Sequence, residues 1–212
     1  MKTWLFDILA CPLDKSFPLK LYIFSFENEP EEFQSLIKIY EKRDINFIKN
    51  EALIELSHDK NGSYIRDNII IEKTNLKNYL TLIYSSLIEF ENIFDKSSNK
   101  FSRKCIELMN STVKSRIMEF IENPNSEQFD KILPELYFIN KIKLDFEIKT
   151  GLLYCSSCKR WYPIIDTIPQ MLPDKYRDEI KDVEFLERHK NLLEKEFFDQ
   201  DIKPYKIKKK NQ

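Results

Sequence analysis

The sequence predicts an α+β protein in which a small antiparallel β domain, built from both chain ends, carries a large inserted α-helical module and a C-terminal helix. Three observations support this prediction. Apolar and polar residues roughly alternate near both ends, at residues 17–26 and 144–165, as is typical of strands with one buried face. Between these stretches, residues 29–143 repeat apolar side chains at helical spacing. A last helical pattern follows Pro173.

Composition limits the classes of function. The chain has 212 residues and a formal net charge of −1, so it can bury a core and has no overall field that attracts nucleic acid. Gly62 and Gly151 are its only glycines. Dinucleotide folds, Walker loops and the glycine-rich turn of typical S-adenosylmethionine-dependent methyltransferases need glycine close to the ligand. We therefore expect the chain to bind neither a nucleotide nor S-adenosylmethionine in those ways.

Targeting and cysteine patterns are consistent with an intracellular protein. No segment resembles a cleaved signal sequence, and no run of about 18 apolar residues occurs. We expect a cytoplasmic protein without a membrane span. Four cysteines are too few for a disulfide scaffold, and the Cys155-Ser-Ser-Cys158 spacing favours metal or redox chemistry. His58 and His189 are near no plausible nucleophile in sequence and are interpreted as surface residues.

The N-terminal elements follow from local patterns. TWLFDILA predicts a short helix with Thr3 as its N-cap, which Pro12 would end. FPLKLYIFSF, residues 17–26, predicts a strand with Leu19, Leu21 and Ile23 on one side.

The middle block has the pattern of a helical module. PEEFQSLIKIYEKR begins with a proline suited to the first helical turn. Three further segments continue the helical spacing, with turn signals between them: LKNYLTLIYSSLIEFENIF, KCIELMNSTVKSRIMEFIE and SEQFDKILPELYFINKI. IRDNIIIEK predicts one short strand within the block.

The C-terminal third returns to strands and then to helix. LDFEIKTGLLYC predicts a hairpin that turns at Thr150–Gly151, and RWYPIID predicts a further strand. Beyond Pro173, YRDEIKDVEFLERHKNLLEKEFFDQ predicts a single helix, followed by the basic tail KPYKIKKKNQ. A terminal lysine run is usually solvated, and contact with RNA is the alternative. The expected domains are residues 1–28 with 144–176, the inserted helices 29–143, and the C-terminal helix and tail 177–212.

The two ends together resemble the Trm-one-twelve family of small zinc-ribbon subunits that activate methyltransferases. DILACPLDKSFPLKL corresponds to the family's N-terminal knuckle, and GLLYCSSCKRWYPIIDTIPQMLP to its strand pair and closing motif. The chain departs from the family pattern in three ways: Asp14 replaces the fourth cysteine, Thr167 replaces a glycine, and the helical insert is longer than in compact members of the family. The matching residues are Gly151, Leu153, Cys155, Cys158, Arg160, Tyr162, Pro163, Ile164, Ile168, Pro169, Met171 and Leu172.

The resemblance implies a zinc site formed by Cys11, Asp14, Cys155 and Cys158. Structural zinc usually has thiolate and imidazole ligands, and three cysteines with one carboxylate are chemically allowed. The alternative is a ribbon that has lost its metal and is held by its hydrophobic core, with the cysteines as small buried residues or in a disulfide. Cys105 lies in a helical stripe and is interpreted as a buried core residue.

The segment RWYPIIDTIPQML would have apolar residues on both faces of a strand. A small ribbon covers one face with its own core, so the other must meet the inserted helices or a partner. The family lends this strand edge to a methyltransferase sheet, which favours the partner. Trp161 and Met171 are the expected anchors. The predicted partner-binding residues are Arg160, Trp161, Tyr162, Pro163, Ile164, Ile165, Ile168, Pro169, Met171 and Leu172.

By this resemblance the chain is a non-catalytic activating subunit, in heterodimers with several alternative S-adenosylmethionine-dependent methyltransferases. Those enzymes would modify tRNA, rRNA or a translation release factor, and the chain would meet RNA only indirectly. Two rival hypotheses remain open. A zinc-ribbon RNA-binding module would place Lys159, Arg160 and the lysine tail on phosphates. A thiol oxidoreductase would use Cys155 and Cys158 and would need a lowered thiol pKa.

Overall fold

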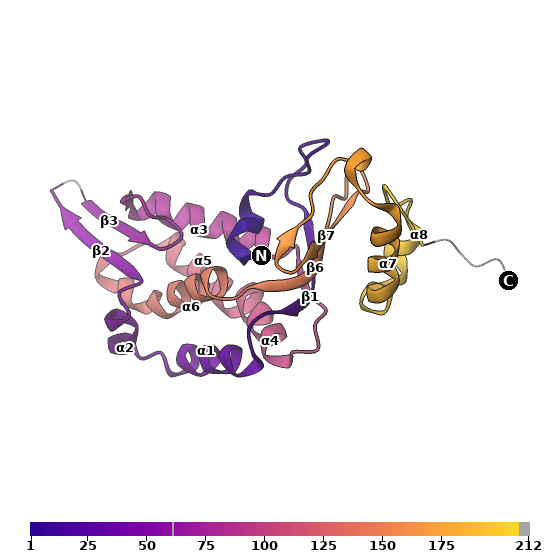
Figure 1. Ribbon diagram of the computed structural model, residues 1–212. Coiled ribbons are helices and arrows are strands. Elements are labelled where there is room, and N and C mark those ends of the chain that lie inside the picture. Colours follow the sequence, from indigo (N-terminus) through magenta and orange to yellow (C-terminus); the bar gives the residue numbers. More distant parts are fainter. Residues whose placement is uncertain (61, 208–212) are drawn as a thin grey trace.

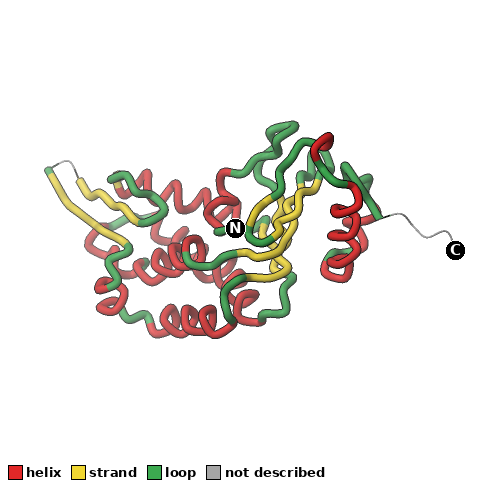
Figure 2. Tube along the Cα trace, viewed as in Figure 1, coloured by secondary structure: helices red, strands yellow, loops and turns green. Residues whose placement is uncertain are grey.

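A five-stranded sheet lies between an inserted helical module and two C-terminal helices (Figure 1). The structure is a computed structural model that describes residues 1–60 and 62–207. Helices and strands are both abundant, so the α+β class is confirmed (Figure 2). Among the described residues, no helix is long and apolar enough to cross a membrane.

The sheet combines strands from distant parts of the sequence, in the order β5-β1-β6-β7-β8. β1 runs parallel to β5 and antiparallel to β6, and β6–β7 and β7–β8 are antiparallel pairs. Leu153 of β6 pairs with Leu21 on one side and with Tyr162 on the other. The helical module itself thus contributes one strand, β5, to this sheet. The strands are β1 Lys20–Phe26, β5 Ile93–Asp95, β6 Ile148–Tyr154, β7 Trp161–Ile165 and β8 Ile168–Pro169.

The turn predicted at Thr150–Gly151 is wrong, because β6 continues through both residues. Gly151 instead lies where two strands come unusually close: a Cβ at this position would be 2.7 Å from the carbonyl oxygen of Tyr22. The register of β1 against β6 shifts beside this point, between Ile23 and Ser25. Glycine is therefore required here by packing rather than by a turn. The chain reverses later, at residues 155–160.

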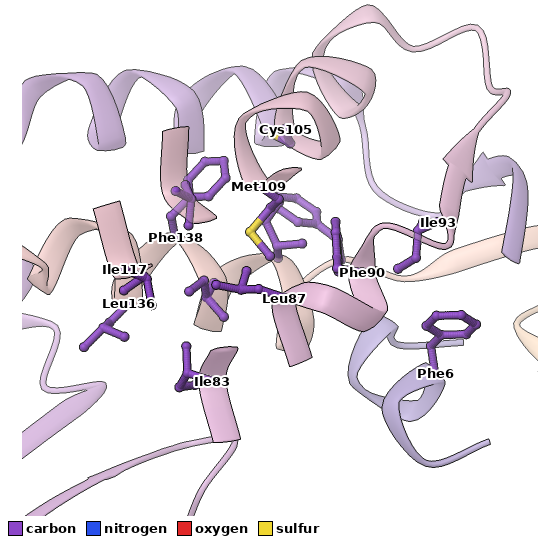
Figure 3. Packing of buried hydrophobic residues seen from close by; sticks show 14 of the residues in the cluster. Phe6, Ile83, Leu87, Phe90, Ile93, Cys105, Met109, Ile117, Leu136 and Phe138 are labelled. Atoms are coloured by element: carbon purple, nitrogen blue, oxygen red, sulfur yellow. The ribbon is translucent and has the colours of Figure 1, made fainter. Parts of the chain in front are cut away.

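The predicted helices of the inserted module are present. α1 begins with Pro30 and has the capping box formed by Glu29 and Glu32. A π-helical turn, Met109–Val113, joins α4 and α5 into one rod. Buried side chains such as Phe90, Met109 and Phe138 fill the space between the helices (Figure 3). The helices are α1 Pro30–Lys42, α2 Ile45–Asn50, α3 Leu76–Phe90, α4 Lys100–Leu108, α5 Lys114–Glu122 and α6 Leu133–Leu144.

The module also contains a β-hairpin that the sequence analysis did not predict. β2 Ile54–Asp59 pairs with β3 Gly62–Asp67, which pairs in turn with the short β4 Thr74–Asn75. The single strand predicted over residues 65–73 therefore ends early. Asp67 explains the ending, because its carboxylate accepts hydrogen bonds from the amides of Ile69 and Ile70 and turns the chain.

The terminal helices differ from the prediction. The first is a 3₁₀ helix, Thr3–Ile8, and the Thr3 hydroxyl donates to the carbonyl of Ile142 instead of capping it. The single helix predicted after Pro173 is divided into α7 Glu179–His189 and α8 Lys195–Asp199. Leu193, between the two helices, and Phe197 of α8 both belong to the hydrophobic cluster on the sheet. The lysine run 208–210 lies outside the described residues.

The two faces of the sheet have different covers. The module face, which includes Leu21, Ile23, Leu153, Tyr162 and Ile164, belongs to the same hydrophobic core as the inserted helices. The C-terminal face packs against the C-terminal segment, defined here as residues 177–207, and forms a separate cluster. Its sheet residues are Tyr22, Phe24, Leu152, Tyr154 and Trp161.

Candidate metal centre and partner edge

Two knuckles with the same backbone hydrogen bonds lie at one end of the sheet. In the first, the Cys11 amide donates to Ser16 O at 3.0 Å and the Lys15 amide donates to Cys11 O at 2.9 Å. In the second, the Cys155 amide donates to Arg160 O at 2.8 Å and the Lys159 amide to Cys155 O at 3.0 Å. The two loops are therefore structural equivalents.

The residue after each knuckle has the same unusual conformation. Lys15 and Lys159 both have φ of 62°, in the left-handed region that few residues other than glycine and asparagine adopt. The same backbone path places Asp14 and Cys158 at equivalent positions. Asp14 thus stands where the second knuckle has its second sulfur, as the resemblance implies.

Four side chains converge between the knuckles. The ligand atoms of Cys11, Asp14, Cys155 and Cys158 all lie within 4.8 Å of one another. Cys11 Sγ is 3.6 Å from Cys158 Sγ, and Cys155 Sγ is 3.6 Å from both Asp14 oxygens. A tetrahedral site with Zn–S bonds of about 2.3 Å separates its sulfurs by about 3.8 Å. This donor set therefore fits a zinc ion.

The same distances argue against a disulfide. All four cysteines carry free thiols, and the 3.6 Å between Cys11 Sγ and Cys158 Sγ exceeds the disulfide bond length of about 2.05 Å. Cys105 is buried in the helical module, as predicted, and burial raises the pKa of its thiol to about 12.

Electrostatics at the centre favour a charged Asp14 carboxylate beside a protonated Cys155 thiol. A hydrogen bond from Cys11, followed by the Ser16 amide, lowers the pKa of Asp14. Burial raises the pKa of Cys155 to about 11, which is the opposite of what a nucleophilic thiol of an oxidoreductase needs. A metal ion would reverse this shift, because its positive charge deprotonates the thiols that coordinate it.

The predicted partner-binding residues divide into a buried and an accessible group. Trp161, Tyr162 and Ile164 are 0% exposed, and Pro163 is also buried. The expectation that inserted helices or a partner cover the second face is therefore corrected: the C-terminal segment covers it. Phe185 of α7 stacks on Trp161 with ring centres 6.2 Å apart. The cause is long-range packing that no local pattern encodes.

The accessible group lies at the β8 end of the sheet. Ile165, Ile168 and Leu172 are 41%, 59% and 43% exposed, while Pro169 and Met171 are half-buried. β8 is the outermost strand, so its outer edge has no neighbour among the described strands. Arg160 is also half-buried, and its guanidinium pairs with Asp174 at 2.9 Å. That ion pair reduces its availability for phosphate.

The structure adds Arg177, which the sequence analysis did not single out, and corrects the placement of His189. Arg177 is almost fully buried, with its guanidinium carbon 4.5 Å from the ring centre of Trp161. His189, interpreted from sequence as a surface residue, is half-buried and stacks on Phe24 at 4.8 Å. His58 is exposed, as expected. The helical stripe of α7 signalled a buried face, but it did not indicate which surface the helix packs against.

The fold and the centre together define an α+β protein whose paired knuckles hold three thiols and one carboxylate. Comparison with family models then identifies its relatives. The chain belongs to the Trm112p-like protein family, whose model matches residues 2–166. Searches of curated proteins and of solved structures found no match. The matched residues include both knuckles and the inserted module, and they end just before β8.

Proposed function

We propose that this chain is a non-catalytic activating subunit of S-adenosylmethionine-dependent methyltransferases that modify tRNA, rRNA or a translation release factor. Membership of the Trm112p-like family over residues 2–166 is the observation that carries the proposal. Within it, residues 1–28 and 144–176 form a zinc-ribbon-like docking domain and residues 29–143 an inserted module. The partner enzyme binds the cofactor and contacts the RNA.

The β8 edge supports docking by strand addition. Ile165, Ile168 and Leu172 are exposed apolar side chains beside a strand whose outer edge is open among the described residues. A partner strand that pairs with such an edge gains main-chain hydrogen bonds, and alternate side chains give specificity. Zinc between the knuckles would fix the opposite end of the sheet and make the edge rigid.

Activation then follows from mass action. A subunit that binds only the folded enzyme stabilises it and favours the conformation that binds the cofactor. Several methyltransferases that share one docking mode would compete for the same edge, so each heterodimer holds one of them.

Affinity capture of the tagged chain from its own cells, followed by mass spectrometry, tests the proposal. We expect methyltransferases to co-purify with the wild-type chain and to be lost at least about tenfold with Ile168→Asp, because the edge would then bury an unpaired charge. Ile71→Asp is the matched control, since Ile71 is also exposed, at 73%, but lies in the inserted module. Equal capture by Ile168→Asp, with unchanged circular dichroism, would place the interface elsewhere.

A further inference from the structure

The C-terminal segment, residues 177–207, occupies a strand edge as well as a sheet face. It follows the residues that match the family model, which end at 166. β8 pairs only with Ile164 and Ile165 of β7, so the remaining outer edge of β7 is left for another neighbour. The C-terminal segment takes that position.

Its pairing with β7 resembles an added strand. Arg160 and Lys203 form a parallel bridge. The Trp161 amide donates to Lys203 O at 3.1 Å, and the Lys203 amide donates to Lys159 O at 2.9 Å. The Trp161 indole Nε1 also donates to Tyr205 O at 3.0 Å. These are the main-chain contacts that a partner strand would make at the same edge.

Arg177 donates a hydrogen bond to the next backbone carbonyl on this edge, that of Trp161. Its Nη1 donates to Trp161 O at 2.5 Å, and its Nε donates to Asp182 Oδ2 at 2.8 Å. The carbonyl of Pro163 accepts from the Gln170 amide at 2.8 Å. The outward backbone groups from Lys159 through Pro163, at the start of β7, are therefore all used by the chain itself.

The apolar contacts of the segment cover the aromatic face behind this edge. Phe185 stacks on Trp161, and Phe197 meets Tyr154 with ring centres 5.3 Å apart. Leu186 and Ile202 are 0% and 2% exposed in the same cluster. A surface of this kind, with a strand edge and adjoining aromatic side chains, is well suited to binding another protein.

Among residues 1–60 and 62–207, the covering segment is connected to the sheet strands through its N-terminal end, which follows β8. The inserted module, in contrast, is connected to sheet strands at both of its ends. Because the C-terminal cluster is separate from the main core, the segment can detach by local opening without unfolding the module. The edge that remains open, β8, offers only two residues, whereas strands usually pair over about three to ten.

We propose that the C-terminal segment is an autoinhibitory latch that closes the β7 edge and the Trp161 face against a methyltransferase. A partner strand first meets β8 and then displaces residues 177–207 to extend its pairing along β7. This inference rests on the proposed function. The free chain has only a fraction of molecules with the edge open, and that fraction reduces the apparent affinity for the partner.

The test uses the full-length chain with Trp4→Phe, which leaves Trp161 as the only tryptophan because the sequence has two. Leu186→Ala removes a fully buried contact of the latch. Ile180→Ala, in the same helix but with a side chain 72% exposed, is the matched control. The binding probe is a methyltransferase that the wild-type chain captures from its own cells, purified separately and titrated against each variant.

We expect Leu186→Ala to bind this methyltransferase about tenfold more tightly than the parent chain, and Ile180→Ala to bind it equally. Complex formation should also change the fluorescence emission of Trp161, because the indole loses its contact with Phe185. If Leu186→Ala binds equally or more weakly while the module remains folded, the latch is overturned and the subunit proposal stands. If no methyltransferase binds the parent chain or the variants, both are overturned.

A second variant covers the case in which Leu186→Ala does not fold. Arg177→Gln removes the hydrogen bond to Trp161 O but deletes no side chain from the apolar cluster. We expect Arg177→Gln also to bind the methyltransferase about tenfold more tightly than the parent chain. Equal or weaker binding would overturn the latch and leave the subunit proposal standing.

Discussion

The two faces of the sheet differ in how their covers are attached and in what they are made of. The module face shares one core with helices whose chain leaves the sheet and returns to it. The C-terminal face is mainly aromatic, and within the described part of the chain its cover connects to the sheet strands at its N-terminal end. A cover held at both ends cannot open without unfolding the protein, whereas a cover held at one end can open alone. The contrast suggests that stability resides on one face and regulation on the other.

The largest expected effect is in the core that the module face shares with the inserted helices. Phe138→Ala should lower the free energy of unfolding by about 3–5 kcal/mol, because the side chain is fully buried and its removal leaves a cavity. Urea denaturation followed by circular dichroism measures this change. Met118→Ala, with a side chain 38% exposed, is the control and should stay within about 0.5 kcal/mol. A small effect of Phe138→Ala would mean that the module is not the stable half.

The metal centre is expected to support both faces, since its knuckles join the N-terminus to the β6–β7 turn. Zinc at about a thousandfold excess over its dissociation constant should stabilise the chain by about 4 kcal/mol. Asp14→Ala should reduce this gain, and Asp14→Cys should keep it by completing four thiolates. Denaturation with zinc and with a chelator measures the difference. An unchanged midpoint in the wild-type chain would favour a ribbon without metal.

Phe185→Ala removes a phenylalanine ring from the C-terminal face, as Phe138→Ala does from the module core. It should lower the stability of the module less. We expect hydrogen exchange at the Trp161 amide, which donates to Lys203 O, to become faster. The free energy of unfolding of the module should change by less than about 1 kcal/mol, because the segment opens separately. The Leu21 amide, which donates to Asn92 O within the sheet, is the internal control. Equal acceleration at both amides would show that the two faces unfold together.

The smallest effect is a pH dependence confined to the C-terminal face. Burial lowers the pKa of His189 below its usual value of 6.5. A detached segment would therefore bind more protons than a docked one, so docking is favoured above about pH 6.5 and weakens as the pH falls. In the Trp4→Phe chain, Trp161 fluorescence should report this loosening between pH 7.5 and 5.5. His189→Gln should abolish it, and an unchanged pH profile in that variant would assign the effect to another group.

The sequence predicted the knuckles and most helices because their signals are local. Cysteine spacing, the proline at the start of α1 and helical periodicity each depend on residues within one or two turns. The sequence did not predict the break between α7 and α8, the β2–β3 hairpin or the role of Gly151. These features depend on contacts between residues that are far apart in the sequence. Asp67 is an example, because its carboxylate also accepts hydrogen bonds from Tyr79 and Asn140, which lie in two different helices.

The sequence by itself determined the strands near both chain ends, most of the helices, the four ligand residues of the knuckles and the apolar character of both faces of β7. Only the tertiary structure decided what covers each face. The reason is physical: the free energy of apolar burial depends little on the direction of a contact or on which apolar group makes it. A stripe of leucine and phenylalanine on α7 therefore predicts that this face is buried, but not which surface it packs against. The surface that it meets is selected by chain connectivity and by the strand edge at Trp161, with which Lys203 pairs.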